Sequence, residues 1–140
     1  MSLTNDTSIT LLLPQRAPFV MVDHLLHDDD ALTRTSFLVK DDGLFVEEGR
    51  LEAAALVENI AQTAAAGAGY KAKQHQRPVK VGFIGAIKNL VVNYLPHVGQ
   101  IIITETRLVH TVFNVSIVEG RVICDDEVIA SCEMKIFLQP

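Results

Sequence analysis

Three things are scarce in this sequence: cysteine, long apolar runs and clustered positive charge. Its 140 residues include only two cysteines, Cys124 and Cys132, with no second Cys or His pair at metal-ligand spacing. We therefore expect reduced thiols, no metal site and no other cofactor. No apolar run reaches the roughly 20 residues that a transmembrane helix needs, so we expect no membrane span.

The charge balance is acidic, with 12 Lys and Arg against 17 Asp and Glu and a net charge of -5. Nucleic-acid binding needs clustered basic side chains over a broad face, so we do not expect a nucleic acid as partner. The segment 1–10, MSLTNDTSIT, lacks the basic and apolar regions of a secretion signal. We expect a cytoplasmic protein whose first ten residues are loose.

The chain is nevertheless rich in apolar residues, which make up 49% of it. A chain of this length can bury a sizeable core without disulfides or metal, so we expect residues 1–140 to form one domain. The apolar fraction exceeds what a small sphere can hide. We therefore expect an oligomer interface, in a homodimer or a larger assembly.

One stretch, LEAAALVENIAQTAAAGAGYKAK at residues 51–73, is predicted to be a long helix that is apolar on every side. Such a helix is a core element around which the remaining chain packs. Glu58 is the charge in its middle, and Gln62 lies one turn further on the same face. A buried carboxylate without partners is costly, so Glu58 is expected to be either satisfied locally or used in function.

The rest of the sequence predicts mainly antiparallel strands. Residues 19–27 and 31–40 are expected to form a hairpin, and residues 41–50 a loop that leads to the helix. Three β-rich stretches follow, at residues 80–94, at 100–119 with a kink suggested near Phe113, and at 121–137 after a turn at Gly120. This order predicts an α+β domain whose antiparallel sheet wraps around one long central helix.

Three segments carry a recognisable pattern: LLPQRAPFVMVDHLL at residues 12–26, LVENIAQTAAAG at residues 56–67 and GFIGAIKNLVVNYLPHVG at residues 82–99. They are similar to the opening, the helix start and a strand of the hot-dog 3-hydroxyacyl-carrier-protein dehydratases of fatty acid synthesis. The narrower resemblance is to relatives in aryl polyene and flexirubin-type pigment pathways. It implies the hot-dog fold and places Glu58 on the catalytic carboxylate and Gln62 on its helical neighbour.

The loop before the helix departs from the family pattern. Those dehydratases carry a catalytic His in a GHFPG loop, whereas this loop reads GLFVEEGR and the chain has no His between His27 and His75. Counting back from Glu58 puts Leu44 or Phe45 at the position of that His. The usual pair of catalytic groups is therefore absent from this chain.

The resemblance also implies where a substrate binds. Phe83 and Gly85 fall on the FxG of the matching strand, while Leu44 and Phe45 occupy the loop before the helix. We expect these four residues to contact the substrate.

Dehydration of a 3-hydroxyacyl thioester needs a base for the C2 proton and an acid for the leaving hydroxyl. Without the His, Glu58 alone can fill only one of these roles. Three functions stay open: a dehydratase-like enzyme, a non-catalytic subunit of a hot-dog heterodimer, and an acyl thioesterase whose carboxylate attacks the thioester or activates water. A purely structural pairing of Glu58 with Gln62 is the alternative to all three.

A basic segment after the helix interrupts the otherwise acidic chain. It contains a third of the Lys and Arg residues, namely Lys71, Lys73, Arg77 and Lys80. Acyl carrier proteins are acidic, and such a patch beside a pocket would attract one electrostatically. A solubilising helix end is the alternative. The expected partners are thus an acyl carrier protein or coenzyme A thioester and a second hot-dog subunit, identical or different.

Overall fold

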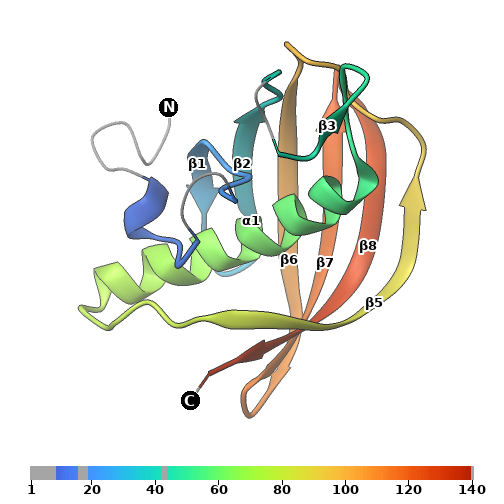
Figure 1. Ribbon diagram of the computed structural model, residues 1–140. Helices are drawn as coiled ribbons and strands as arrows, with labels where there is room; N and C mark the ends of the chain where they lie inside the picture. The colour runs from blue at the N-terminus through green and yellow to red at the C-terminus, as the bar shows by residue number, and fades with distance from the viewer. Residues whose placement is uncertain (1–8, 16–18, 42–43, 140) are drawn as a thin grey trace.

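The chain folds into one long α-helix and a curled antiparallel sheet, as Figure 1 shows. The computed structural model describes residues 9–15, 19–41 and 44–139, so most of the segment expected to be loose lies outside the described residues. The elements follow the chain in this order: η1 Ile9–Leu11, β1 His24–Asp28, β2 Thr33–Leu38, β3 Val46–Glu47, β4 Arg50–Leu51, α1 Ala53–Gln74, β5 Gly82–Val92, β6 Ile101–Val112, β7 Val115–Cys124 and β8 Glu127–Leu138.

The main sheet has six strands in the order β1-β2-β6-β7-β8-β5, and all neighbouring pairs are antiparallel. The pairing of Thr33 with Thr106 joins the N-terminal hairpin to the C-terminal strands. The sheet curls around α1, with β1 at one edge and β5 at the other. The predicted α+β architecture, a sheet wrapped around one long helix, is confirmed.

The core lies between α1 and the sheet. The Ala-rich sequence of α1 has high helix propensity, and Leu56 and Ile60 are fully buried in the same cluster as Val122 and Met134. At Gly120 the sheet comes so close to the helix that an added Cβ would collide with the Ile60 side chain. A larger residue at this crossing would therefore force the Ile60 side chain or the helix to shift.

The helix is not apolar on every side, which corrects the sequence interpretation. Asn59, Gln62 and Thr63 are fully buried on the same helix that carries the apolar core residues. Buried amides and hydroxyls are costly unless they are hydrogen-bonded, and each of these three has partners on neighbouring segments. This polar face of α1 lies beside Glu58.

The expected division of the last strands was wrong. β6 and β7 are joined by a turn at residues 113–114, and Gly120 lies inside β7, paired with Thr106 and Cys132. Phe113 has a φ of 55°, a backbone conformation that favours glycine, and its side chain is 96% exposed. The hairpin therefore ends in a strained, solvent-facing aromatic residue.

The N-terminal strand is shorter than expected. β1 begins only at His24, and Phe19 to Val22 form no strand but lie against α1, bonded to its side chains. Residues 41–50, expected to be a loop, contribute to the small β3–β4 hairpin, whose turn places Glu48 and Gly49 at positive φ.

The two cysteines are free and buried, on β7 and β8. Burial raises the pKa of both thiols, that of Cys124 with help from the nearby Asp125 carboxylate. Both side chains are therefore protonated at neutral pH. In the part of the chain that the structure describes, no helix has the length and apolar character needed to cross a bilayer.

Candidate functional site

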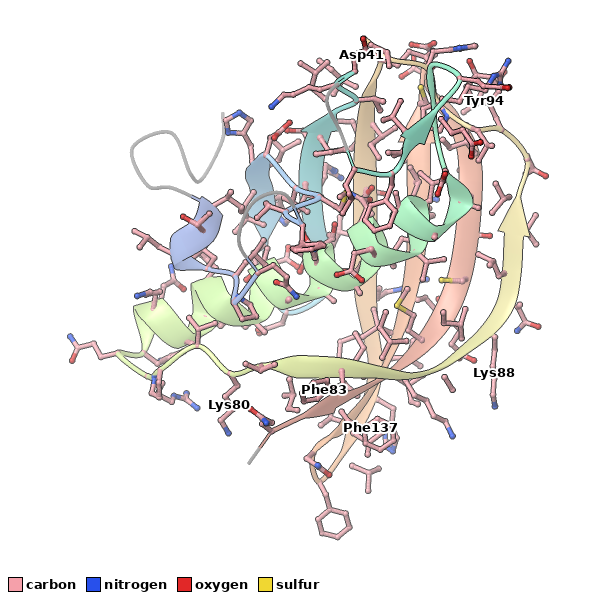
Figure 2. All side chains as sticks on the ribbon, viewed as in Figure 1. Asp41, Lys80, Phe83, Lys88, Tyr94 and Phe137 are labelled. Carbon is pink, nitrogen blue, oxygen red and sulfur yellow. The ribbon has the colours of Figure 1, made fainter. Side chains whose placement is uncertain are left out.

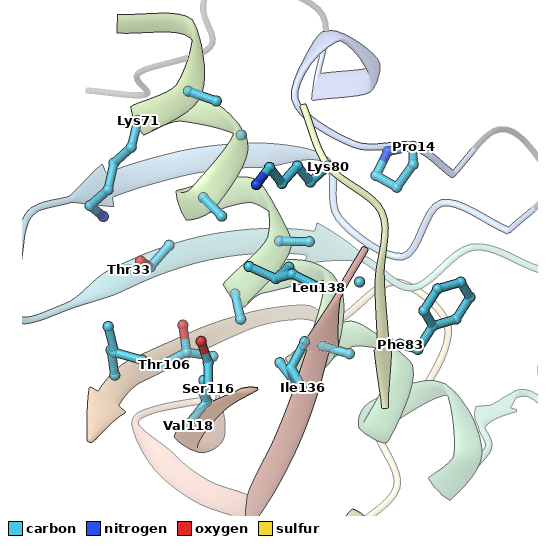
Figure 3. A pocket seen from close by; sticks show the side chains of 18 of the residues that line it. Pro14, Thr33, Lys71, Lys80, Phe83, Thr106, Ser116, Val118, Ile136 and Leu138 are labelled. Carbon is cyan, nitrogen blue, oxygen red and sulfur yellow. The ribbon is translucent and has the colours of Figure 1, made fainter. Parts of the chain in front are cut away.

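Glu58 lies on α1 where two cavities meet. The larger is an open groove of about 950 Å³ between α1, the start of β5 and the ends of β6 to β8 (Figure 3). The smaller, of about 440 Å³, is bounded by Phe19, Phe45, Ala54 and Glu58 itself. The half-buried carboxylate can therefore reach molecules in either cavity.

Gln62 holds Glu58 in place. Its side-chain nitrogen donates to Glu58 Oε1 at 2.9 Å and to the Phe19 carbonyl at 2.8 Å, and its oxygen accepts from the Met21 N–H at 2.7 Å. Both amide hydrogens are thus occupied inside the protein. The other carboxylate oxygen of Glu58 has no hydrogen-bond partner among the described residues.

Asn59 and three threonines extend this network of hydrogen bonds from the helix to the sheet. The Asn59 side chain donates to the Met21 carbonyl at 2.6 Å and accepts from the Thr104 hydroxyl on β6 at 2.5 Å. Thr63 bonds the Asn59 carbonyl and the Thr35 hydroxyl on β2. The segment around Met21 is therefore hydrogen-bonded to α1, whose Asn59 and Thr63 are bonded in turn to the sheet, and this segment carries Phe19 to the wall of the smaller cavity.

Histidine is missing from the vicinity of Glu58 in the part of the chain that the structure describes. His75, just after α1, is the one His among the described residues that line the two cavities. Because an α-helix rises about 1.5 Å per residue, His75 lies about 25 Å from Glu58 along the helix axis. The side chain of His27 is hydrogen-bonded to Asp29, with 2.7 Å between Nε2 and Oδ2. Within one subunit, the described residues give Glu58 no imidazole partner.

The four residues expected to contact substrate divide into two pairs. Phe45 lines the smaller cavity and Phe83 the groove, so both share a cavity with Glu58. Leu44 and Gly85 line neither cavity. Gly85 lies at a bulge where β5 shifts its register against β8, and the Phe137 ring occupies the space that a Cβ would need (Figure 2).

The four basic residues expected to form a patch also divide. Lys71, Arg77 and Lys80 line the groove, whereas Lys73 is exposed outside it. Lys71 bonds both carboxylate oxygens of Asp28 at 2.8 Å, and the Asp28 side chain is only 2% exposed. The positive charge of Lys71 is therefore largely neutralised by Asp28 within the protein.

The β1–β2 turn contributes two acidic residues, Asp29 and Asp30, to the lining of the groove. A hydrogen bond from His27 and the N–H groups of Leu32 and Ala31 lower the pKa of Asp29 to about 2. Asp29 is therefore ionised at any physiological pH, and its oxygens are already engaged by these donors. Unpaired positive charge in the groove thus lies on the side of Arg77 and Lys80.

Three residues of the site were not identified from the sequence: Phe19, Ala54 and Asn59. Asn59 offered a signal, because an amide beside Glu58 in an apolar helix requires partners. Phe19 offered none, since the hydrogen bond that holds it to Gln62 joins positions 43 residues apart. No group of three His, Cys, Asp or Glu among the described residues could hold a metal ion.

Comparison with known proteins gives one match at the level of sequence families. A family model described as ApeP-like, ApeP dehydratase, matches residues 7–140. No protein with a curated description matches the sequence.

Solved structures share the fold. A chain of the dehydratase heterocomplex ApeI:P from Xenorhabdus doucetiae has a TM-score of 0.88 at 17% identity, over 95% of this chain and 91% of that one. A Streptococcus mutans protein bound to acetyl CoA has a TM-score of 0.67 at 12% identity, over 91% and 95%. A hypothetical thioesterase with coenzyme A from Streptococcus pneumoniae has 0.64 at 8%, over 82% and 84%. The expected hot-dog fold is confirmed.

Proposed function

Because the chain belongs to the ApeP-like dehydratase family, we propose that it takes part in the dehydration of 3-hydroxyacyl thioesters in fatty acid or polyene biosynthesis. One observation carries the proposal: Glu58 stands between two cavities with one carboxylate oxygen held by Gln62 and the other open. Glu58 is the acid–base group, and Gln62 is its positioning residue.

The elimination moves two protons, one from C2 and one to the hydroxyl oxygen on C3. A base takes the C2 proton, the C3–O bond breaks as the C2=C3 double bond forms, and an acid protonates the hydroxyl so that it leaves as water. Glu58 supplies one of these two groups. The N–H groups of Ala55 and Leu56 in the first turn of α1 donate to the Glu52 carbonyl. Ala54 lines the same small cavity, and the N–H at this position has no intrahelical acceptor, so it suits the negative charge that develops on the thioester oxygen.

The second acid–base group is best placed on a neighbouring subunit. The described residues offer Glu58 no His, and the Xenorhabdus doucetiae relative in fold is named as a dehydratase heterocomplex. β5 is an edge strand that exposes Ile87, Leu90 and Val91, as expected of a subunit contact. We infer that the working enzyme is a homodimer or a heterodimer with a composite site.

The thioester is carried by an acyl carrier protein or by coenzyme A. Phe45 and Phe83 contact the bound substrate from the two cavities. The basic surface that attracts the carrier consists of Lys73, Arg77 and Lys80, while Lys71 is excluded because Asp28 holds it.

The proposal is tested by assaying the purified chain, alone and co-purified with its natural subunits, on a 3-hydroxyacyl carrier protein. Loss of water is followed by mass spectrometry. Replacing Glu58 by Gln is expected to lower kcat by about 10²- to 10⁴-fold, the usual contribution of an acid–base group. The matched control is Glu47→Gln, which removes an exposed carboxylate that lines neither cavity.

The outcomes separate the possible functions. Turnover that needs both a second subunit and Glu58 supports the composite site. Turnover by the assembly that is indifferent to Glu58→Gln would refute the assignment and identify the chain as a non-catalytic subunit.

Thioester hydrolysis is the second candidate, and the open carboxylate without a His favours it. A carboxylate can attack the thioester or activate water, with donors of a helix N-terminus polarising the carbonyl. Release of free thiol from a panel of acyl thioesters, abolished by Glu58→Gln, would establish this reaction. Formation of enoyl product without thiol release would exclude it.

A further inference from the structure

The turn of the β6–β7 hairpin is an exposed apolar tip that lines neither cavity. Figure 1 shows this turn projecting from the sheet below β5. The side chain of Phe113 at the turn is 96% exposed, and Val112 beside it is also exposed. Val112 pairs with Val115 of β7, which pairs with Phe137 of β8, so these three side chains form one row on the same face of the sheet. The tip is therefore apolar across three strands.

The next row on this face is basic. His110 of β6 pairs with Ile117 of β7, and Ile117 pairs with Lys135 of β8. Lys135 forms no ion pair with any described residue, so its charge is available to a partner. Because a strand rises about 3.3 Å per residue, this row lies about 10–13 Å behind Phe113 along the hairpin.

Carboxylates appear on this face only in the third row from the tip. Arg107 of β6 bonds Glu119 of β7 at 3.3 Å, and Glu119 pairs with Glu133 of β8. The sequence contains 17 Asp and Glu, yet none of them falls within residues 106–118 or 134–139, which include the tip and the basic row. In a chain with a net charge of -5, this end of the sheet is thus apolar and positively charged.

The order of these rows matches the order of groups across the surface of a lipid bilayer. Proteins that bind such a surface bury apolar side chains about 5–10 Å deep at the boundary of headgroups and acyl chains, and basic side chains behind them attract anionic headgroups. An acidic protein would also attract the cations, but it would leave unexplained why an aromatic side chain is the most exposed point of the hairpin. β8 separates the hairpin from β5, so a subunit bound along β5 leaves the tip free.

We propose that the tip of the β6–β7 hairpin docks this protein on an anionic lipid surface. Phe113 and Val112 enter the boundary between headgroups and acyl chains, while Lys135 and the His110 ring face the headgroup phosphates. Docking is shallow and reversible, because one hairpin tip buries few apolar side chains. This inference goes beyond the proposed function and does not depend on it, since none of these four residues lines a cavity at Glu58.

Insertion can be followed by fluorescence, because the sequence contains no Trp. The Phe113→Trp variant, in the assembly as isolated, is mixed with vesicles of phosphatidylglycerol and phosphatidylcholine in equal amounts. Its emission, measured against the unsubstituted assembly, is expected to shift to shorter wavelengths and to be quenched by brominated acyl chains. The control Val128→Trp places the indole at an exposed apolar position at the opposite end of β8 and should show neither effect.

Sedimentation with the same vesicles measures what each group contributes to binding. Phe113→Ser is expected to weaken binding about tenfold, since it removes the largest inserted side chain. Lys135→Gln should weaken binding to the anionic vesicles about fivefold and leave binding to pure phosphatidylcholine unchanged. The matched controls, Val128→Ser and Lys40→Gln, lie outside the tip and the basic row and should bind like the wild type.

Three results would overturn the proposal. The first is a wild-type assembly that does not bind anionic vesicles, or a Phe113→Ser variant that binds them equally well. The second is short-wavelength emission of the Phe113→Trp assembly before lipid is added, which would show that another subunit covers the tip. The third is an emission shift caused by an acidic acyl carrier protein but not by vesicles, which would make the tip a protein contact.

Discussion

Gln62 uses both amide hydrogens and its carbonyl oxygen within the protein, on Phe19, Met21 and Glu58. Such a side chain cannot also exchange protons with a substrate. Its role is to tie the orientation of the carboxylate to the position of the Phe19 backbone. At the scale of single residues, the proposed site therefore has Glu58 as its reactive group and Gln62 as the residue that supports it.

Replacing Gln62 by Met tests this support. The variant keeps the volume but leaves the Met21 N–H and the Phe19 carbonyl without their partner, which is expected to cost about 2–4 kcal/mol in the free energy of unfolding. Glu58→Gln should cost less than about 1 kcal/mol, because this half-exposed side chain can still bond Gln62. Urea unfolding followed by circular dichroism measures both. Equal losses in the two variants would contradict the assigned roles.

Glu105 is expected to make the stability of the folded protein depend on pH in the acidic range. Burial by itself raises the pKa of this carboxyl, but hydrogen bonds from Arg121 and Arg34 outweigh burial and hold the pKa below its usual value near 4.5. Because the unfolded chain binds the proton more readily, the stabilisation is complete above about pH 4.5 and is lost as the pH falls through the folded pKa.

The Glu105→Gln variant is expected to lose about 1–2 kcal/mol at neutral pH, since both arginines are partly exposed. Its stability should then fall less than that of the wild type between about pH 5 and about pH 3. Urea titrations across this range provide the test. Glu119→Gln, in the exposed pair with Arg107, is the control and should cost no more than about 0.5 kcal/mol. Parallel pH profiles for all three proteins would refute the prediction.

Among the secondary-structure elements, the crossing of α1 over β7 depends on the contact between Gly120 and Ile60. Gly120→Ala is expected to destabilise the protein by about 1–3 kcal/mol through overpacking. Ile60→Ala alone should cost about 2–5 kcal/mol by leaving a cavity. In the double variant the new methyl group occupies part of that cavity, so the combined loss should be smaller than the sum. Additive losses in a double-mutant cycle would show that the two positions do not share a contact.

The same crossing explains where the sequence interpretation of the elements succeeded and failed. Helix propensity and apolar spacing predicted α1 and most strands, because those signals are local. Gly120 indicated a turn, yet it is glycine because a helix passes over it. The real turn at residues 113–114 contains neither Gly nor Pro, so the sequence suggested only a kink near Phe113 within one strand. Phe19 to Val22 look like a strand because they are apolar, but side chains of α1 hold them.

Only some residues of the candidate site could be singled out from the sequence. Glu58 and Gln62 stood out because they interrupt an apolar helix. The pairing of Lys71 with Asp28 joins positions 43 residues apart, and the wall formed by Phe19 depends on contacts of the same range. Such long-range contacts depend on how the chain folds back on itself. They leave no periodic pattern in the sequence from which they could be predicted.

At the scale of the whole molecule, the edge strand β5 predicts association. Its exposed Ile87, Leu90 and Val91 are expected to be covered by another subunit, so light scattering should give at least twice the mass of one chain. Ile87→Lys should shift the protein toward the monomer. Val109→Lys, an equally apolar and exposed position on β6, is the control and should leave the mass unchanged. A wild-type monomer would contradict the composite site as well.

The pairing of β2 with β6 also sets the order in which this protein can fold. Arg34 and Glu105, bonded across these strands, are 71 residues apart in the sequence. Contacts that close such long loops form slowly, after local helices and hairpins. The bonds that hold Met21 to Gln62 and Asn59 of α1 also close loops, of 41 and 38 residues. A nascent or partly folded chain is therefore expected to have its helix before its Glu58 carboxylate is positioned, so the proposed substrate site should form late in folding.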